Sequence, residues 1–223
     1  MSMLSMLETG NGHQRDQAYL KFRRLLILQQ VNQGERLREA DWADRLGVNR
    51  TALREAFARL EAEGLIEKGP KTGYFAPKLT RDDLLEIVEV RVMLEGGAIE
   101  RICRKGLNTA KHLEPMRLAC DQLERLLAED YVLGVAEADR RFHESLIDAA
   151  GSKRLAMLYH RAPLPIIYPD VVTGKEWEAN ESRTLHEHRD ILQAILEGKP
   201  REACELLRGH LMDGLLKSLD LHT

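Results

Sequence analysis

The sequence is poor in cysteine, and its three cysteines suggest neither a cross-linked scaffold nor a zinc finger. Cys103, Cys120 and Cys204 are far apart and odd in number, so no disulfide framework and no Cys-x-x-Cys site follows from them. Buried thiols in a reducing compartment fit this usage better. We therefore expect a cytoplasmic protein.

Long apolar runs are missing as well. No stretch approaches the roughly 20 consecutive apolar residues that a membrane-spanning helix needs. The first residues include Glu8 and Asp16, and they lack the apolar core of a signal peptide. These features predict a protein that has no membrane partner.

A strong excess of one charge is also absent, because the 223 residues carry a formal net charge of −3. The whole chain is therefore not a general binder of polyanions. The charges are unevenly distributed, however. Residues 1–78 hold 13 Lys and Arg against 10 Asp and Glu, whereas residues 79–223 hold 20 against 26. The modest positive excess lies in the same part of the chain as the motif described next.

Residues 38–63 have the pattern of two short helices joined by a tight turn. Apolar residues recur at the spacing of an amphipathic helix on both sides of Gly47, Val48 and Asn49. Gly47 can adopt a positive φ in the turn, and Asn49 can cap the second helix. This is the helix-turn-helix arrangement, although an ordinary helical hairpin with solvated arginines would show the same pattern. A preceding helix is expected over residues 14–33.

A β-hairpin is predicted directly after this motif. Residues 64–69 and 74–77 have the composition of short strands around a turn at residues 70–73. Such a hairpin is the wing of a winged helix, and Lys68 and Lys71 lie near its tip, where a phosphate or the minor groove would be. We therefore predict a winged helix-turn-helix domain over residues 1–77 that binds double-stranded DNA.

The candidate DNA contacts lie before the first helix of the motif, at the start of the second helix and in the wing. Arginine at the start of a recognition helix can grip a guanine with two hydrogen bonds or hold a phosphate. The candidate DNA-binding residues are Arg38, Asn49, Arg50, Thr51, Arg54, Lys71, Thr72 and Gly73.

Residues 78–223 are predicted to form an all-helical bundle, so the fold class is mainly α with a small β-wing. Thr80 and Asp83 form a capping sequence for the first helix of the bundle. No convincing strand pattern follows. The expected helices cover residues 80–105, 109–129, 131–149, 152–162, 175–197 and 200–220.

Polar residues occupy positions on these helices that should face inward. Asp139 and His143 are four residues apart and share one helix face, and His188 and His210 each lie among aliphatic residues. A buried carboxylate is costly unless it is paired or bound to a metal. Three His and one Asp could hold a divalent ion and leave positions for a ligand. The alternative is a surface Asp–His pair with ordinary core or surface histidines, and the residue pattern leaves both open.

Nearly all of the chain from residue 14 onward resembles GntR-type transcriptional regulators of the FadR subgroup, which carry an FCD effector domain. The N-terminal portion that carries this resemblance is LGVNRTALREAFARLEAEGLIEKGPKTGYF. The C-terminal portions are ADRRFHESLIDAAGS, EHRDILQAILEGKPREA and GHL. The resemblance implies that Asp139, His143, His188 and His210 bind a divalent metal. Zinc is the first expectation, with nickel or another divalent ion as alternatives.

The resemblance also implies a homodimer on a pseudo-palindromic operator and a small organic acid or sugar acid coordinated at the metal. Arg91 lies where the family often has an Arg directed into the pocket, and it could neutralise a carboxylate of the effector. A surface pair with Glu95, four residues further on, is an equal alternative. Ala40 departs from the family, which often has a DNA-contacting Arg at this position.

We therefore predict a ligand-responsive DNA-binding transcriptional regulator, most often a repressor in this family, and not an enzyme. One alternative is a helical metal-dependent hydrolase with an accessory winged helix. No residue beside the predicted ligands is a candidate general acid or base, which disfavours it. Another alternative is a winged helix used for protein contacts, with the metal as a structural staple.

Overall fold

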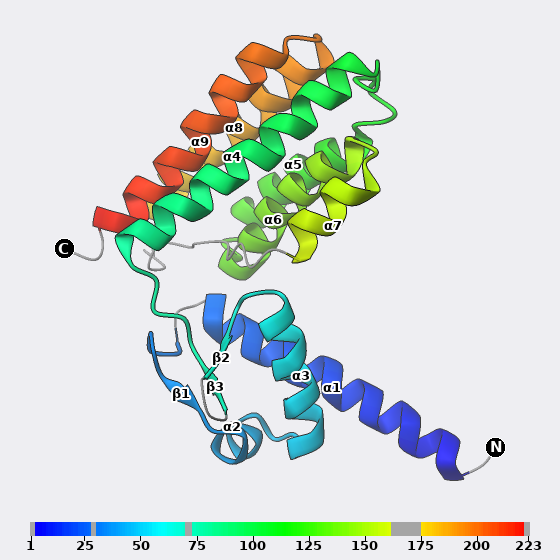
Figure 1. The fold of residues 1–223 in the computed structure, drawn as a ribbon, viewed down its shortest axis with the longest axis vertical. Coiled ribbons are helices and arrows are strands. Elements are labelled where there is room, and N and C mark those ends of the chain that lie inside the picture. Colours follow the sequence, from blue (N-terminus) through cyan, green and yellow to red (C-terminus); the bar gives the residue numbers. More distant parts are fainter. Residues whose placement is uncertain (1–2, 28–29, 70–72, 162–174, 221–223) are drawn as a thin grey trace. The chain divides into compact units, whose positions relative to one another are not determined.

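The computed structural model describes residues 3–27, 30–69, 73–161 and 175–220 (Figure 1). These residues form two compact units, and the chain passes from one to the other between Leu79 and Thr80. The predicted fold class is confirmed, because a helix-turn-helix with a small antiparallel sheet precedes a set of helices without strands in the described part of the chain.

The N-terminal unit contains three helices and a three-stranded antiparallel sheet. Its elements are α1 (Met3–Ile27), β1 (Arg36–Leu37), α2 (Glu39–Leu46), α3 (Arg50–Ala62), β2 (Glu67–Lys68) and β3 (Tyr74–Phe75). The strand order is β1-β3-β2, so the second wing strand is central. β1 was not predicted, because two extended residues are too short to show an alternating pattern. The predicted helix over residues 14–33 was wrong at both ends, since α1 is described from Met3 to Ile27 and residues 30–33 are not helical.

The turn between α2 and α3 has the predicted geometry. Gly47 adopts a left-handed conformation with φ 64°, and its N–H reaches the carbonyl oxygens at the end of α2. The Oδ1 atom of Asn49 accepts a hydrogen bond of 2.7 Å from the backbone N–H of Ala52, which caps α3. The two residues therefore set where α2 ends and where α3 begins.

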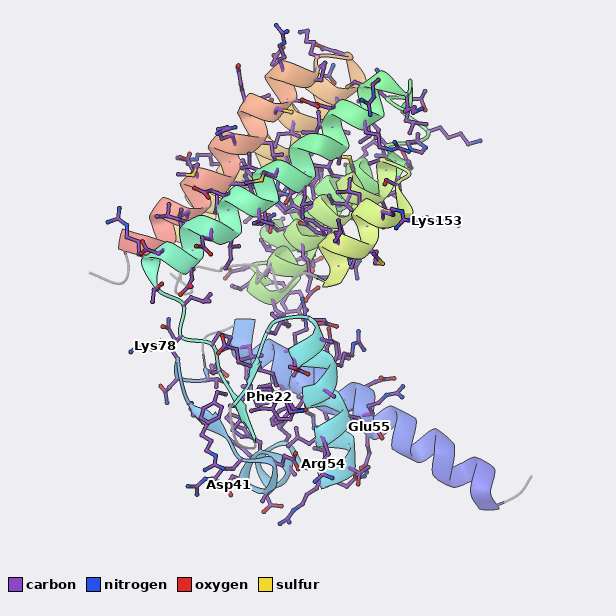
Figure 2. The ribbon with its side chains drawn as sticks, in the orientation of Figure 1. Phe22, Asp41, Arg54, Glu55, Lys78 and Lys153 are labelled. Atoms are coloured by element: carbon purple, nitrogen blue, oxygen red, sulfur yellow. The ribbon has the colours of Figure 1, made fainter. Side chains whose placement is uncertain are left out.

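Aromatic side chains fill the centre of the N-terminal unit. Phe22 of α1 is fully buried and makes edge-to-face contacts with Trp42 of α2 and Phe57 of α3, each with ring centroids 4.8 Å apart. Figure 2 shows Phe22 inside this unit and Arg54 on its outer side. α1 thus packs against both helices of the helix-turn-helix through Phe22.

The C-terminal unit is a ring of helices. Its elements are α4 (Arg81–Arg104), α5 (Glu114–Ala128), α6 (Val132–Ala149), α7 (Lys153–Arg161), α8 (Lys175–Leu196) and α9 (Pro200–Asp220). Around the ring α4 packs on α9, α9 on α8, α8 on α5, α5 on α6, and α6 again on α4 (Figure 1). Residues that point inward from α4, α6, α8 and α9 therefore meet in one interior space.

The start of α4 confirms the predicted capping sequence. The Thr80 hydroxyl accepts a hydrogen bond from the Asp83 N–H at 3.2 Å, and the Asp83 carboxylate accepts one from the Thr80 N–H at 2.7 Å. Two backbone donors that the helix cannot satisfy internally are thereby paired. Among the described residues, no helix has the length and apolarity needed to cross a membrane.

Candidate metal site and nucleic-acid interface

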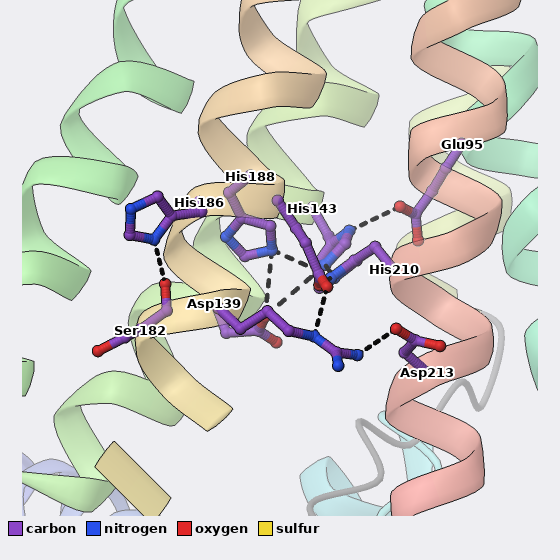
Figure 3. Close-up of polar contacts among 10 residues, drawn as sticks. Glu95, Asp139, His143, Ser182, His186, His188, His210 and Asp213 are labelled. Carbon is purple, nitrogen blue, oxygen red and sulfur yellow. Dashed lines mark hydrogen bonds and ion pairs between the residues drawn. The ribbon is translucent and has the colours of Figure 1, made fainter. Parts of the chain in front are cut away.

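The four predicted metal ligands meet in the interior of the C-terminal unit (Figure 3). Asp139 and His143 lie one turn apart on α6, His188 lies on α8 and His210 on α9. One potential ligand atom from each residue lies within 4.8 Å of all the others. His143 and His188 are buried, whereas the Asp139 side chain is 15% exposed and that of His210 is 9% exposed. The structure thus brings together all four residues singled out from the sequence.

The distances between donor atoms match those of a coordination shell. The Nε2 atom of His210 lies 3.1 Å from Nε2 of His143 and 3.2 Å from Nε2 of His188. The Oδ1 atom of Asp139 lies 3.3 Å from Nε2 of His188 and 3.8 Å from Nε2 of His143. Bonds of about 2.0–2.1 Å place adjacent donors of a coordination shell about 2.9–3.4 Å apart, depending on the coordination number. The cluster therefore has the size that a single divalent ion requires.

The protonation of the imidazoles explains why a cation fits at this centre. The Nδ1 atom of His143 lies 2.6 Å from Oε2 of Glu95, and the Nδ1 atom of His210 lies 2.8 Å from Oε2 of Glu187. An ionised carboxylate can only accept, so each Nδ1 carries the proton, and in the neutral form of these rings the lone pair on each Nε2 points toward the other ring. Two lone pairs 3.1 Å apart repel, and a cation bound by both removes this repulsion.

His188 contributes the third imidazole in a different way. Its ring stacks on Phe142 with centroids 3.9 Å apart and 10° between the planes. Burial, reinforced by the neighbouring His210 and His143, lowers the pKa of His188 well below its ordinary value. Burial likewise lowers the pKa of His143, although Glu95 acts against it. Both rings are therefore neutral at pH 7, which is the form that binds metals.

Glu95 of α4 is a buried carboxylate that joins three side chains. Its Oε2 atom accepts from His143, while its Oε1 atom accepts from Arg91 Nε at 2.8 Å and from the Tyr159 hydroxyl at 3.0 Å. Burial alone would raise the pKa of Glu95, but the positive charge of Arg91 and the hydrogen bonds from His143 and Arg91 lower it to about 2. Glu95 is therefore ionised at neutral pH. From the sequence, Glu95 was considered only as a surface partner of Arg91.

Arg91 is buried together with Glu95, which corrects the surface pair considered from the sequence. Burial alone would lower the pKa of Arg91, but Glu95 raises it, so the guanidinium stays charged. Its side chain is only 11% exposed. Its Nη2 atom has no hydrogen-bond partner among the described residues. A buried charged donor left unsatisfied in this way is costly, which makes it a suitable contact for an acidic ligand.

His186 is close to His188 in sequence but does not belong to the cluster. It lies two residues before His188 on α8, is exposed, and donates from Nδ1 to the carbonyl oxygen of Ser182 at 2.6 Å (Figure 3). Residues two apart on a helix point in different directions. His186 therefore lies outside the cluster.

Six of the eight candidate DNA-binding residues lie in the described part of the N-terminal unit. Arg50 and Thr51 begin α3 and are exposed, and Arg38 is the exposed residue before α2. Gly73 precedes β3 with φ 102°, a conformation that favours glycine in the wing. Lys71 and Thr72 lie outside the described residues. The exposed start of α3 is what a recognition helix presents to base edges.

Arg54 has a partner that the sequence did not predict. Its Nε atom lies 3.1 Å and its Nη2 atom 2.8 Å from Oε2 of Glu39 on α2. The Arg54 side chain remains 67% exposed, so water screens this pair and its contribution to stability is small. Glu39 instead holds the guanidinium on the outer side of α3 (Figure 2). Contact of Arg54 with DNA stays a prediction.

Comparison with known proteins identifies both units. Residues 14–75 match the family model described as bacterial regulatory proteins, gntR family, and residues 86–213 match the FCD domain. An HTH-type transcriptional regulator of Agrobacterium vitis, itself uncharacterized, is 36% identical over 120 residues, covering 52% of this chain and 69% of that protein. A Paenarthrobacter nicotinovorans protein named "Probable D-xylose utilization operon transcriptional repressor" is 28% identical over 178 residues, covering 80% and 76%.

A solved structure shows the same fold over almost the whole length. The protein called McbR/YncC from E. coli superposes with a TM-score of 0.71 at 17% identity, covering 94% of this chain and 99% of that chain. A winged helix-turn-helix joined to a helical bundle of this type defines a DNA-binding transcriptional regulator and not an enzyme. The chain belongs to the gntR family of bacterial regulatory proteins and carries an FCD domain.

Proposed function

We propose that this regulator is a homodimeric repressor whose affinity for its operator responds to a small carboxylate bound at a divalent metal ion. The observation that carries the proposal is the convergence of Asp139, His143, His188 and His210 within 4.8 Å. Three imidazoles and one carboxylate from three helices suit zinc first, and nickel or another divalent ion as alternatives. When bound, the ion supplies a Lewis-acidic centre that accepts an oxygen ligand.

The effector fits the charges that surround this centre. Four protein donors leave room for oxygen ligands on an ion of five or six coordination. Arg91 is buried beside the cluster, and its Nη2 atom has no partner in the described part of the chain. A carboxylate of a small organic or sugar acid could bind the metal with one group and accept from Arg91 with another oxygen. Both contacts favour an anion over a neutral sugar.

The DNA-binding part of the proposal rests on the start of α3. Arg50, Thr51 and Asn49 lie where a recognition helix meets base edges and phosphates, and Arg38, Arg54 and Gly73 flank them. A homodimer would place two α3 helices on half-sites about one turn of DNA apart, roughly 34 Å, which implies a pseudo-palindromic operator. Lys71 and Thr72 are further proposed contacts in the wing.

The effector can change the affinity for DNA only if the protein has two conformations that differ in their affinity for DNA and also in their affinity for the effector. The cluster connects α6, α8 and α9, and Glu95 adds α4, so a ligand at the ion acts on four helices of the ring. A shift in their packing would change how the two winged helices of a dimer are held. Repression by the free protein and release by the effector is the form we propose, which agrees with the name of the Paenarthrobacter relative.

The test begins with the metal. Protein purified without chelator is subjected to elemental analysis, and its thermal unfolding is measured with a panel of small mono- and dicarboxylic acids. We expect one divalent ion per chain and stabilisation by one class of acid, which is lost after chelation and restored by zinc. Stabilisation that survives chelation would place the effector elsewhere, and absence of any ion binding would refute the metal site.

The second arm of the test concerns DNA. An operator is selected from random duplexes and its binding is followed by fluorescence anisotropy at fixed salt, because phosphate contacts make affinity salt-dependent. The acid found in the first arm should weaken binding in the presence of metal. The Arg91→Ala variant should lose the response to the acid, and elemental analysis of this variant separates loss of the effector contact from loss of the ion, because Arg91 also holds Glu95 behind His143. A full response in this variant would remove Arg91 from the effector site.

A further inference from the structure

Two of the cluster histidines have the same arrangement behind them. On α4, Arg91 and Glu95 are four residues apart, and Glu95 accepts from Nδ1 of His143 on α6. On α8, Arg183 and Glu187 are four residues apart, and Glu187 accepts from Nδ1 of His210 on α9. Each carboxylate uses one oxygen for the arginine and the other for the histidine of a neighbouring helix.

From this repetition we propose that Glu95 and Glu187 are positioning residues, which hold His143 and His210 with the proton on Nδ1 and the lone pair on Nε2 toward the ion. The inference rests on the proposed metal site and identifies the residues that prepare it. The second nitrogen of a metal-binding histidine commonly donates to a carboxylate, which sets the tautomer and the ring orientation. Arg91 and Arg183 in turn hold the carboxylates in place through their Nε atoms.

The two supports differ in strength. Glu95 is fully buried and also accepts from Tyr159, so its orientation is determined by three donors. Glu187 is 24% exposed and its arginine is 49% exposed, so water can partly replace either contact. Arg183 also pairs with Asp213 on α9, which ties this second support to the helix of His210. We therefore expect Glu95 to matter more than Glu187 for metal affinity.

His188 lacks such a support. Its Nδ1 atom is buried and has no hydrogen-bond partner among the described residues, and its ring is held by stacking on Phe142 instead. When no ion is bound, the contacts of its Nε2 atom with Asp139 and His210 favour a proton on Nε2, so His188 would have to move this proton to Nδ1 to bind an ion. His143 and His210 are therefore held with the lone pair on Nε2 before an ion binds, whereas His188 takes this form only on binding.

Glutamine substitutions test the assignment because an amide keeps the shape but offers only one acceptor oxygen. In Glu95→Gln the oxygen is drawn to Arg91 and Tyr159, which are two donors, so the amide N–H₂ faces His143. His143 must then accept at Nδ1 and carry its proton on Nε2, which blocks the ion. Zinc affinity of the full-length protein, measured by competition with a chromophoric chelator, should fall about 100-fold for Glu95→Gln and about tenfold for Glu187→Gln.

The matched control is Glu144→Gln. Glu144 also pairs with an arginine four residues away, Arg140, and its 28% exposure is close to that of Glu187, but its carboxylate contacts no histidine in the described part of the structure. Its zinc affinity should equal that of the unmodified protein. If both test variants also bind zinc as the unmodified protein does, the positioning role is refuted.

Nitrogen-15 NMR spectra of histidine-labelled, metal-free protein report the tautomer of each histidine. A merely structural role of Glu95 and Glu187 would leave these tautomers unchanged in the glutamine variants. His143 and His210 should be protonated on Nδ1 in the unmodified protein, and each should change tautomer only in its own glutamine variant. If Glu95→Gln fails to fold, both measurements are made on Glu187→Gln alone, because Glu187 is more exposed. Protonation on Nε2 in the unmodified protein would overturn the inference. Correct tautomers in a protein that binds no divalent ion would refute the metal site instead.

Discussion

Replacing Glu95 by leucine should destabilise the C-terminal unit strongly even when no metal is present. Its carboxylate is fully buried and faces Arg91, whose side chain is 11% exposed. The same surroundings lower the pKa of Glu95 from 4.5 to about 2, so the ionised form, which pairs with Arg91, is the one present at pH 7. Removing one partner of a buried ion pair leaves an uncompensated charge and costs about 3–5 kcal/mol. Total stabilities of about 5–15 kcal/mol make this a large fraction.

The assay is urea unfolding of chelator-treated protein at pH 7, followed by far-UV circular dichroism because most helices lie in the C-terminal unit. The double variant Arg91→Leu/Glu95→Leu should recover part of the loss, since it removes the unpaired charge of Arg91 and leaves the His143 N–H and the Tyr159 hydroxyl unpaired, at about 1–3 kcal/mol each. Glu124→Leu is the control, because Glu124 pairs with Arg189 at the surface, where the side chains are 55% and 42% exposed.

The control should change the free energy of unfolding by less than about 1 kcal/mol. The reasoning fails if Glu95→Leu is no more damaging than Glu124→Leu. It also fails if the double variant is less stable than Glu95→Leu, because the cost would then not come from the unpaired charge of Arg91.

Three further perturbations address other parts of the chain. Phe22→Ala should lower the stability of the N-terminal unit by about 3–5 kcal/mol, because Phe22 is fully buried there. It should leave the zinc affinity of the C-terminal unit unchanged, and a loss of zinc affinity would contradict the independence of the two units. Asp83→Asn should lower stability at pH 7, because hydrogen bonds from Thr80 lower the pKa of Asp83; the difference should vanish in urea titrations as the pH falls through that lowered pKa, and a constant difference would argue against the ionised cap. Arg54→Ala should weaken operator binding by about 1–3 kcal/mol in anisotropy if Arg54 reads a base, and an unchanged affinity would remove it from the interface.

The helices and the four clustered residues were open to prediction because they depend on local spacing. Asp139 and His143 share a face whatever packs against it, and aliphatic neighbours mark His188 and His210 as inward-facing. The helix-turn-helix is equally local, since Gly47 and Asn49 determine its turn. That the separate helices bring these residues to one point was expected from a family resemblance and not from periodicity.

The supporting carboxylates could not be predicted, because their local pattern is common. Arg59 and Glu63 form the same four-residue pair on α3, as do Arg140 and Glu144 on α6, and neither pair supports a cluster histidine. What distinguishes Glu95 is the packing of α4 against α6, which is a long-range contact. The Arg54–Glu39 pair was missed for the same reason, since it depends on how α2 crosses α3.

Stability alone does not account for the polar interior of the bundle. Replacing buried ionic groups by apolar residues of similar volume is often neutral or stabilising by about 1–4 kcal/mol. A ring of helices selected only for stability would therefore fill this space with aliphatic side chains, as α4, α6 and α8 do elsewhere. Instead, three imidazoles and one carboxylate from three helices lie within 4.8 Å of one another, and Glu95 of a fourth helix contacts one of the imidazoles. An ion and its ligand bound there would change the packing of all four helices together, which is the property that a sensor domain needs.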